Sequence, residues 1–348
     1  MQTIYDLNLK ELEEVLAGYG QKPYRAKQIY AWLYRKRAAS FREMSDLPTQ
    51  LISRFEEDYS MMNIREKDRQ VARDETTKFL FELEDGAFVE AVLMHFHFGD
   101  SLCISSQIGC NMGCTFCASG LLKKQRNMTA GEMVQEVLYV QRELDKDGKR
   151  VDNIVIMGTG EPFDNYDNVM NFCRIVNSDL GLAIGARHIT ISTCGLVPAI
   201  RRFAAEHVQY NLAISLHAPD NELRSRLMPV NRAYPLEELM KALRDYSEEN
   251  HRRLTFEYIL LHGVNDSDEH ARKLAKLIRG MNAYVNLIPY NQVEENEYRS
   301  ASDKDALRFY DVLMKNGVKA TLRQKHGDDI DAACGQLRAR HERNRNQL

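Results

Sequence analysis

The stretch CNMGCTFC at residues 110–117 decides the architecture of this chain, because Cys110, Cys114 and Cys117 follow a C-x3-C-x2-C spacing. Three thiolates this close together can hold three irons of a cubane iron–sulfur cluster. A fourth cysteine would saturate the cluster, so a set of three leaves one iron open to a small ligand. An open iron that can be reduced indicates catalysis rather than electron storage.

Two other uses of clustered cysteines have to be weighed. A structural zinc site usually pairs two C-x2-C motifs, or joins one to a later pair of histidines, and this chain has no second C-x2-C pair. A disulfide framework usually has more cysteines than 7 in 348 residues, and an even number of them. The spacing favours the open cluster over both.

Composition limits the class of protein. The chain contains no run of eighteen apolar residues, and the start MQTIYD lacks the basic and apolar segments of a secretion signal. We therefore expect no membrane span and a cytoplasmic location, where thiols stay reduced and clusters can be assembled. A net charge of −3 excludes a uniformly basic nucleic-acid binder but leaves a local basic face open.

Positive charge gathers near both ends of the chain. Residues 22–37 contain no acidic residue, and residues 338–348 carry four arginines against one glutamate. Taken alone, this pattern is more typical of a solvated helix face and a frayed tail than of a binding site. The basic residues of the first stretch are Lys22, Arg25, Lys27, Arg35, Lys36 and Arg37.

The apolar pattern predicts four parts. Residues 1–60 form a helical accessory domain of three short helices, and residues 61–100 form a linker region with a β-hairpin that turns at Asp85-Gly86. Residues 101–337 form the core, and residues 338–348 form a basic tail.

In the core, predicted strands and helices alternate. Strands are expected at 102–106, 153–157, 188–193, 210–216, 254–261, 284–289 and 319–323, and helices at 129–144, 166–176, 198–205, 236–249, 266–279 and 304–315. Six βα units imply a parallel sheet, either an open barrel or a flat stack. Active sites of such sheets lie at the carboxyl ends of the strands, where the cysteine loop falls.

Polar residues end several of these strands. GTGEP at 158–162 follows the second strand, but it lacks the third glycine of a dinucleotide-binding loop. Each residue alone is more often a satisfied turn residue, whereas a set at one edge of one sheet predicts a ring around a ligand. The set is Gly160, Glu161, Ser192, Ser215, Leu216, His217 and Asn291.

Four cysteines lie outside the cluster motif. Cys103 is on the first core strand, and Cys334 lies in the small, flexible context AACG. A free cysteine is most often a buried small hydrophobe, and sequence position does not overturn that interpretation for Cys334. Cys173 falls on an apolar helix face and is expected in the core. Cys194 is expected near the pocket without an evident role.

Taken together, these motifs resemble the radical S-adenosylmethionine superfamily and, within it, the RlmN/Cfr family of RNA methyltransferases. The resemblance rests on the cysteine loop with GTGEP, STCG (192–195), SLHAP (215–219), NLIPYN (286–291) and DIDAACGQL (329–337), and it spans nearly the whole chain. Pro162 and HGDD at 326–329 are typical of the adenine-C2 enzymes rather than the C8-methylating Cfr enzymes. Thr159, Cys194 and Gln292 depart from the family pattern, at positions without a chemical role.

The resemblance implies a partial (βα)6 barrel and assigns roles to residues. Cys110, Cys114 and Cys117 would hold a [4Fe-4S] cluster, and the strand-end residues would line S-adenosyl-L-methionine. Cys334 would be methylated first; a radical from a second S-adenosyl-L-methionine would then activate that methyl group, which adds to adenine C2. Cys103 would remove the C2 proton and close a disulfide bond with Cys334. Glu90 matches a position assigned as proton acceptor.

The same resemblance implies the partners. The substrate would be an adenosine of 23S rRNA, with the adenosine beside the tRNA anticodon left open as a second substrate. The six basic residues of 22–37 would contact phosphates. An electron donor such as flavodoxin or ferredoxin is implied, and we expect a monomer. Two alternatives stay open: a Cfr-type C8 methyltransferase conferring antibiotic resistance, and a non-catalytic iron–sulfur or zinc RNA-binding protein.

Overall fold

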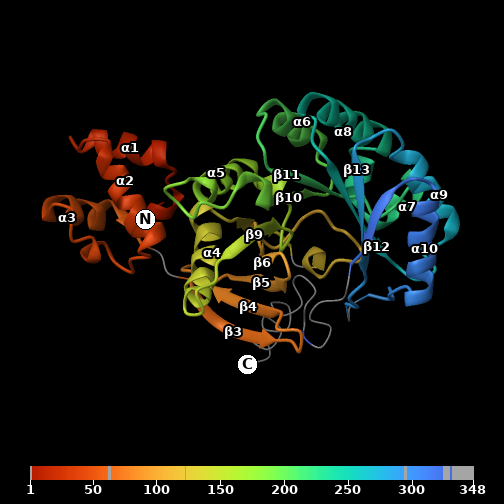
Figure 1. Cartoon of the computed structure of the whole chain (residues 1–348), viewed down its shortest axis with the longest axis horizontal. Coiled ribbons are helices and arrows are strands. Elements are labelled where there is room, and N and C mark those ends of the chain that lie inside the picture. Colours follow the sequence, from red (N-terminus) through yellow and green to blue (C-terminus); the bar gives the residue numbers. More distant parts are fainter. Residues whose placement is uncertain (1, 62–63, 122, 294–295, 324–329, 331–348) are drawn as a thin grey trace.

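The computed structural model describes residues 2–61, 64–121, 123–293, 296–323 and 330. A small group of helices at the N-terminal end packs beside a larger body built on one ten-stranded sheet (Figure 1). A continuous apolar core runs through both parts. Within the described residues, no helix is both long and apolar enough to cross a membrane.

The N-terminal part contains the three expected helices, α1 (Leu9–Gly18), α2 (Tyr24–Tyr30) and α3 (Thr49–Asp58). A capping box between Asn8 and Glu11 starts α1, because each side chain bonds the other residue's backbone N–H. The helix α2 continues into a π-helical turn at Ala31–Arg35. A short parallel pair, β1 (Gln2–Thr3) with β2 (Tyr59–Ser60), joins the two ends of this unit.

The large sheet has the order β14-β13-β12-β11-β10-β9-β6-β5-β4-β3. Every pair from β6 to β14 in this order is parallel, as the alternating strand–helix pattern predicts, and the pairs that join β3, β4, β5 and β6 are antiparallel. The strands are β3 (Arg65–Val71), β4 (Thr77–Glu82), β5 (Phe88–Phe96), β6 (Gly99–Ile104), β9 (Val151–Ile156), β10 (Ile189–Thr193), β11 (Asn211–Ser215), β12 (Leu254–Leu260), β13 (Ala283–Pro289) and β14 (Lys319–Leu322).

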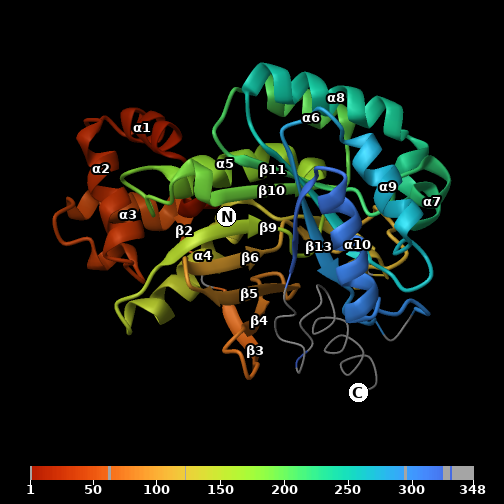
Figure 2. The same ribbon diagram turned by 45° about the vertical axis from the view of Figure 1, so that its right-hand side comes forward.

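Helices follow the parallel strands and cover the outer face of the sheet (Figures 1 and 2). They are α4 (Ala130–Asp145), α5 (Tyr166–Asn177), α6 (Val197–Ala205), α7 (Asn221–Leu227), α8 (Leu236–Asn250), α9 (Asp268–Leu277) and α10 (Asp303–Lys315). Six of the seven match predicted helices. The exception is α7, a seven-residue helix capped by Asp220, which is too short to produce an apolar period in the sequence.

The hairpin β4–β5 has the predicted turn at Asp85-Gly86, but it is not a separate ribbon. Its strand β5 pairs with β6, so the antiparallel strands extend the core sheet. The additional strand β3 pairs with β4 at the edge. Its sequence REKDRQV is mostly charged and polar, so it carries no apolar alternation from which a strand could be predicted.

The sheet curls into an open barrel rather than lying flat. Arg323, the residue after β14, donates a hydrogen bond from its guanidinium to the sulfur of Met94 on β5, at 3.1 Å. Residues near opposite ends of the strand order therefore meet. They enclose a cavity of about 340 Å³, which strands β5, β6 and β9 to β13 help to line.

Candidate active site

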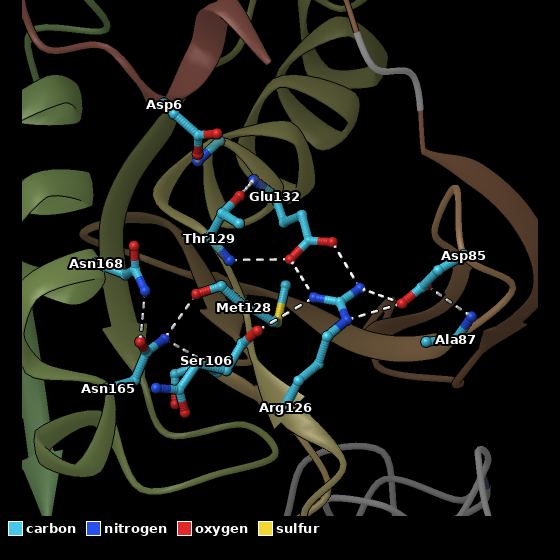
Figure 3. A network of polar contacts seen from close by, with 12 residues as sticks. Asp6, Asp85, Ala87, Ser106, Arg126, Met128, Thr129, Glu132, Asn165 and Asn168 are labelled. Atoms are coloured by element: carbon cyan, nitrogen blue, oxygen red, sulfur yellow. Dashed lines mark hydrogen bonds and ion pairs between the residues drawn. The ribbon is translucent and has the colours of Figure 1, made fainter. Parts of the chain in front are cut away.

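The loop that carries the cysteine motif, residues 109–125, is closed at its base by the antiparallel pair β7 (Gln107–Ile108) and β8 (Arg126–Asn127). Arg126 binds both oxygens of Glu132 at 2.7 and 2.8 Å, and its Nε donates to Asp85 at 2.8 Å (Figure 3). Glu132 belongs to the first turn of α4 and Asp85 to the hairpin turn. The guanidinium therefore ties the cysteine loop to two other elements of the fold.

A second anchor is buried beside the same base. The side-chain amide of Asn165 donates to the carbonyl oxygens of Ser106 and Met128, both at 2.8 Å (Figure 3). Gln107 donates to Asn127 and to Asp164, both at 2.9 Å. These bonds hold the two ends of the cysteine loop in register, so the loop is presented at the carboxyl edge of the sheet.

The three cysteines of this loop line the cavity. Burial raises the pKa of Cys110 to about 11, and burial with the neighbouring thiols raises the pKa of Cys114 further. Three thiolates gathered in a buried place repel one another unless cations bind them, and metal ligation removes that cost. The donor set therefore fits a metal centre.

The segment GTGEP packs against the chain itself. Gly160 has φ +114°, and a Cβ there would lie 2.7 Å from the side chain of Gln107, so only glycine fits. The carboxylate of Glu161 is buried and accepts from the backbone N–H groups of Phe163, at 3.0 Å, and Cys194, at 2.8 Å. Gly160 and Glu161 line the cavity, although the bonds to the protein already use one lone pair on each oxygen of Glu161.

Other strand-end residues gather in the same place. Ser192, Ser215, His217 and Asn291 line the cavity, and the Ser192 and Ser215 hydroxyls lie 3.4 Å apart. Burial lowers the pKa of His217 to about 3, so its ring is neutral, and its Nδ1 accepts from the Ile259 N–H at 3.1 Å. The proton is therefore on Nε2.

Leu216 differs from the other predicted cofactor residues. Its side chain is completely buried in the apolar core and does not line the cavity. Its backbone is bonded on both sides, because the N–H donates to the carbonyl of Glu257 at 3.1 Å and the carbonyl accepts from Arg224 at 3.2 Å. The structure therefore places Leu216 behind the cavity wall.

Cys103 and Glu90 lie on neighbouring strands. Cys103 lines the cavity together with Val92, its partner in the β5–β6 register. Glu90 is two residues before Val92 and therefore on the same face of β5, but it does not line the cavity. Its carboxylate is 3.0 Å from the ammonium group of Lys78, and both side chains are buried.

Four further predicted residues or segments have different outcomes. Cys334 and the tail 338–348 lie outside the described residues. Cys173 is fully buried in the core, as predicted. Cys194 lines the cavity, and burial together with the nearby carboxylate of Glu161 raises the pKa of its thiol.

The basic stretch 22–37 divides into two kinds of residue. Arg37 is half-buried and forms an ion pair with Asp145 of α4 at 3.0 Å, and Arg25 donates to Gln28 and to the carbonyl of Asp46. The exposed members are Lys22, Lys27, Arg35 and Lys36. Arg35 also donates to the carbonyl of Asp179 and Lys36 lies over the Trp32 ring.

Two residues of this region were not predicted from the sequence. Arg224 on α7 is completely buried behind the strand ends, and Glu257 on β12 lines the cavity. Burial raises the pKa of Glu257 to about 7, against the opposing effects of Arg323 and Asn286. A sequence shows that Glu257 alternates with apolar residues on a strand, but it does not show that this face of the strand points inward.

A curled parallel sheet, with three cysteines on a loop after its first barrel strand and polar residues at the other strand ends, defines a radical S-adenosylmethionine enzyme. The profile of the Radical SAM superfamily matches residues 104–275. The profile of the ribosomal RNA large subunit methyltransferase N-terminal domain matches residues 2–61.

Individual relatives narrow the class. A protein of Enterococcus faecalis called probable dual-specificity RNA methyltransferase RlmN is 54% identical over 97% of this chain and 96% of its own length. A Streptococcus suis protein with the same name is 53% identical over 97% of this chain and 92% of its own. A crystal structure of a radical SAM methyltransferase from Sphaerobacter thermophilus superposes with a TM-score of 0.92 at 45% identity, over 97% and 99% of the two chains. The chain belongs to the RlmN family of radical SAM methyltransferases.

Proposed function

We propose that this chain methylates C2 of an adenosine in 23S rRNA, with the adenosine next to the tRNA anticodon as a second substrate. The curated relatives bear the words dual-specificity RNA methyltransferase in their names, which supports an RNA substrate. The observation that carries the proposal is that Cys103 opens into the same cavity as Cys110, Cys114 and Cys117. The thiol to which the proposal gives a role on the base thus lines the same cavity as the three cysteines that would hold the cluster.

The chemical problem explains why thiols are needed. C2 of adenine is an electron-poor carbon without a lone pair, so an electrophilic methyl donor does not alkylate it directly. Reductive cleavage of S-adenosylmethionine, the chemistry that a bound [4Fe-4S] cluster supplies, yields a radical route instead. In the proposal each methyl transfer uses two molecules of S-adenosylmethionine, and the electron comes from a flavodoxin or ferredoxin.

The chain's own residues hold the reactants. Ser192, Ser215 and Asn291 line the cavity with polar groups for S-adenosylmethionine, and neutral His217 has a proton on Nε2 to donate. Apolar neighbours such as Phe116, whose ring packs edge-on against His217 at 4.9 Å between centroids, exclude water from the same space. Polar groups set into apolar walls are typical of a small-molecule site.

Cys334 and Cys103 divide the methyl transfer between them. In the proposal the Cys334 thiolate takes the methyl group and is then joined to the base through it. Cys103 removes the C2 proton and forms the disulfide with Cys334 that releases the product. Glu90 is a candidate proton acceptor, and its position on the same face of β5 as Val92 supports a role near Cys103.

Substitution of the two cysteines tests this proposal. We expect Cys334→Ala to abolish methylation, and Cys103→Ala to accumulate a covalent RNA–protein adduct that denaturing electrophoresis detects. Cys173→Ala, a buried cysteine that does not line the cavity, is the matched control and should retain methylation. Normal C2-methyladenosine from Cys334→Ala, measured by mass spectrometry of nucleosides, would refute the mechanism.

The position of the methyl group and the choice of RNA need a separate measurement. Nucleosides of rRNA and tRNA are compared between a deletion strain and the same strain carrying this chain. C2-methyladenosine in both RNAs is the expected result. C8-methyladenosine would instead assign a Cfr-type activity, and a colourless protein that binds one zinc and leaves RNA unmodified would assign a binding protein.

A further inference from the structure

Among the residues that the structure describes, Arg224 is the largest side chain that is completely buried. It belongs to α7, the short helix between β11 and β12, and it points toward the loops that follow β10 and β11. A guanidinium group is rarely buried without a specific partner, because removing its charge from water is unfavourable. Its contacts therefore indicate a function.

All three nitrogens of the guanidinium donate hydrogen bonds. Nη2 donates to the carbonyls of Cys194, at 2.6 Å, and Ser215, at 3.3 Å. Nε donates to the carbonyl of Leu216 at 3.2 Å, and Nη1 to the side-chain oxygen of Asn231 at 3.0 Å. One side chain thus joins the end of β11 to the loop after β10, and both segments carry residues that line the cavity.

The sequence around Arg224 accommodates this arrangement. Gly195 has φ +108°, and a Cβ there would lie 3.3 Å from Nη2, so a larger residue would crowd the guanidinium. The side-chain nitrogen of Asn231 donates to Asn221 and Ser225, so the side-chain oxygen of Asn231 is held in place to accept the hydrogen bond from Nη1. The guanidinium therefore has one defined orientation.

These acceptors are all neutral. Among the residues that the structure describes, no carboxylate forms an ion pair with Arg224. Burial lowers the pKa of Arg224 to about 10, which still leaves the group positively charged at neutral pH. A buried charge without a counter-ion is unfavourable. We therefore expect a negatively charged group other than a carboxylate of the described residues to bind near Arg224.

The same helix also holds the cysteine loop. The carbonyl of Leu227, the last residue of α7, accepts the N–H of Thr115 at 2.9 Å, and Thr115 follows Cys114 directly. Arg224 lies one turn earlier on the helix. This bond joins the helix that carries Arg224 to the residue next to Cys114, which is one of the three cysteines assigned to the cluster.

We propose that Arg224 is a positioning residue for the cluster site, with two separable effects. Its hydrogen bonds hold the ends of β10 and β11 in the arrangement that receives S-adenosylmethionine, and its positive charge stabilises the reduced form of the cluster. The inference deepens the proposed function, on whose cluster it rests. In the step concerned one electron from a low-potential donor enters the cluster and no bond forms or breaks, so the cluster becomes more negative and a nearby cation favours it.

The charge effect is tested by redox titration of the reconstituted cluster with dithionite as the reductant. In Arg224→Gln the ratio of reduced to oxidised cluster at a fixed potential should fall about tenfold, a shift of about 59 mV to more negative potential for a one-electron couple. Arg226→Gln is the matched control, because Arg226 is an exposed arginine on the same helix. An Arg224→Gln potential equal to that of Arg226→Gln would overturn the charge effect.

Arg224→Lys separates the two effects. This variant keeps the positive charge but loses the planar set of donors. The ratio of reduced to oxidised cluster at a fixed potential should therefore stay within about threefold of that of the unsubstituted protein. The affinity for S-adenosylmethionine, measured by calorimetry, should fall about tenfold. Unchanged affinity in Arg224→Lys would overturn the positioning effect. A lysine variant whose potential shifts as far as that of the glutamine variant would show that geometry, not charge, sets the potential.

Asn231→Asp keeps the test decisive if Arg224→Gln does not fold. The new carboxylate faces Nη1 and neutralises Arg224 while the arginine stays in place, so the potential should again become more negative. An unchanged potential in this variant would count against the proposal. None of these titrations uses RNA, so the two proposals can fail separately. If the variants show the expected shifts in potential but the unsubstituted protein methylates no RNA, the proposed function alone is disproved. If the unsubstituted protein methylates RNA but the variants show no shift, this inference alone is disproved.

Discussion

Two cations that are buried in the described part of the chain, Lys78 and Arg224, have different partners. Lys78 on β4 forms an ion pair at 3.0 Å with Glu90 on the adjacent strand β5. Arg224 on α7 donates to three backbone carbonyls and an amide oxygen, next to the cysteine loop. The antiparallel part of the sheet therefore supplies its own counter-charge, whereas the region beside the cysteines leaves a positive charge for what binds there. Burial of a charge thus marks structure in one place and a ligand site in the other.

The largest expected effect comes from preventing assembly of the cluster, which is the negative group proposed to lie near Arg224. In Cys114→Ala the site loses one of three thiolates, so we expect the iron content after reconstitution and the methylation of RNA both to fall to background. Iron analysis and visible absorbance measure the first, and nucleoside mass spectrometry the second. Cys173→Ala serves as control, since Cys173 is a buried core cysteine of α5. A Cys114→Ala protein with full iron content would contradict the assignment.

The next effect tests the self-neutralised pair. Lys78→Met leaves the Glu90 carboxylate buried without its ammonium partner, and we expect the free energy of unfolding to fall by about 3–5 kcal/mol. Replacing both residues in Lys78→Met/Glu90→Leu should restore most of it. Urea denaturation measures both variants. Lys67→Met, which breaks a partly exposed pair with Glu82 on the same sheet, should cost less than about 1 kcal/mol. Equal losses in the single and double variants would disprove the account.

A third charged group, Glu257, adds a pH dependence to the comparison. Burial raises its pKa to about 7 from 4.5, so the folded protein binds this proton more tightly than the unfolded chain does. The contribution to stability is complete below pH 4.5 and is lost as the pH rises through about 7, with a magnitude on the order of 3 kcal/mol. Glu257→Gln should remove this slope. Unfolding free energies measured across that range check it, and an unchanged slope would exclude Glu257 as its source.

The smallest effect concerns exposed charge. Lys27 is exposed on α2, whereas Arg37 already pairs with Asp145 at 3.0 Å. If the exposed basic residues contact phosphates, Lys27→Gln should weaken RNA binding several-fold and reduce the salt dependence of binding by about one phosphate contact. Arg37→Gln should change it less, because its charge is engaged within the protein. Filter binding at several salt concentrations compares the two, and a larger effect of Arg37→Gln would reverse the assignment.

The outcome of the sequence predictions follows from the range of the interactions involved. Most strands and helices of the core are long enough to show a regular pattern of apolar residues along the sequence. Their positions were therefore predicted to within a few residues. The strand β3 and the helix α7 were missed, because REKDRQV is stabilised by pairing with β4 and the seven residues of α7 depend on a cap at Asp220. Leu216 was placed among the cavity residues since it ends a strand, but its side chain points into the core.

By itself, the sequence determined the cysteine spacing, the order of strands and helices, and the family, because these depend on residues that are neighbours along the chain. The tertiary structure decided that the sheet curls into a barrel, that Cys103 shares a cavity with the cysteines of the C-x3-C-x2-C motif, and that Glu257 and Arg224 are buried beside it. Those properties arise from segments that are distant in sequence. A charge that is ordinary in water acquires its effect only when folding removes it from water.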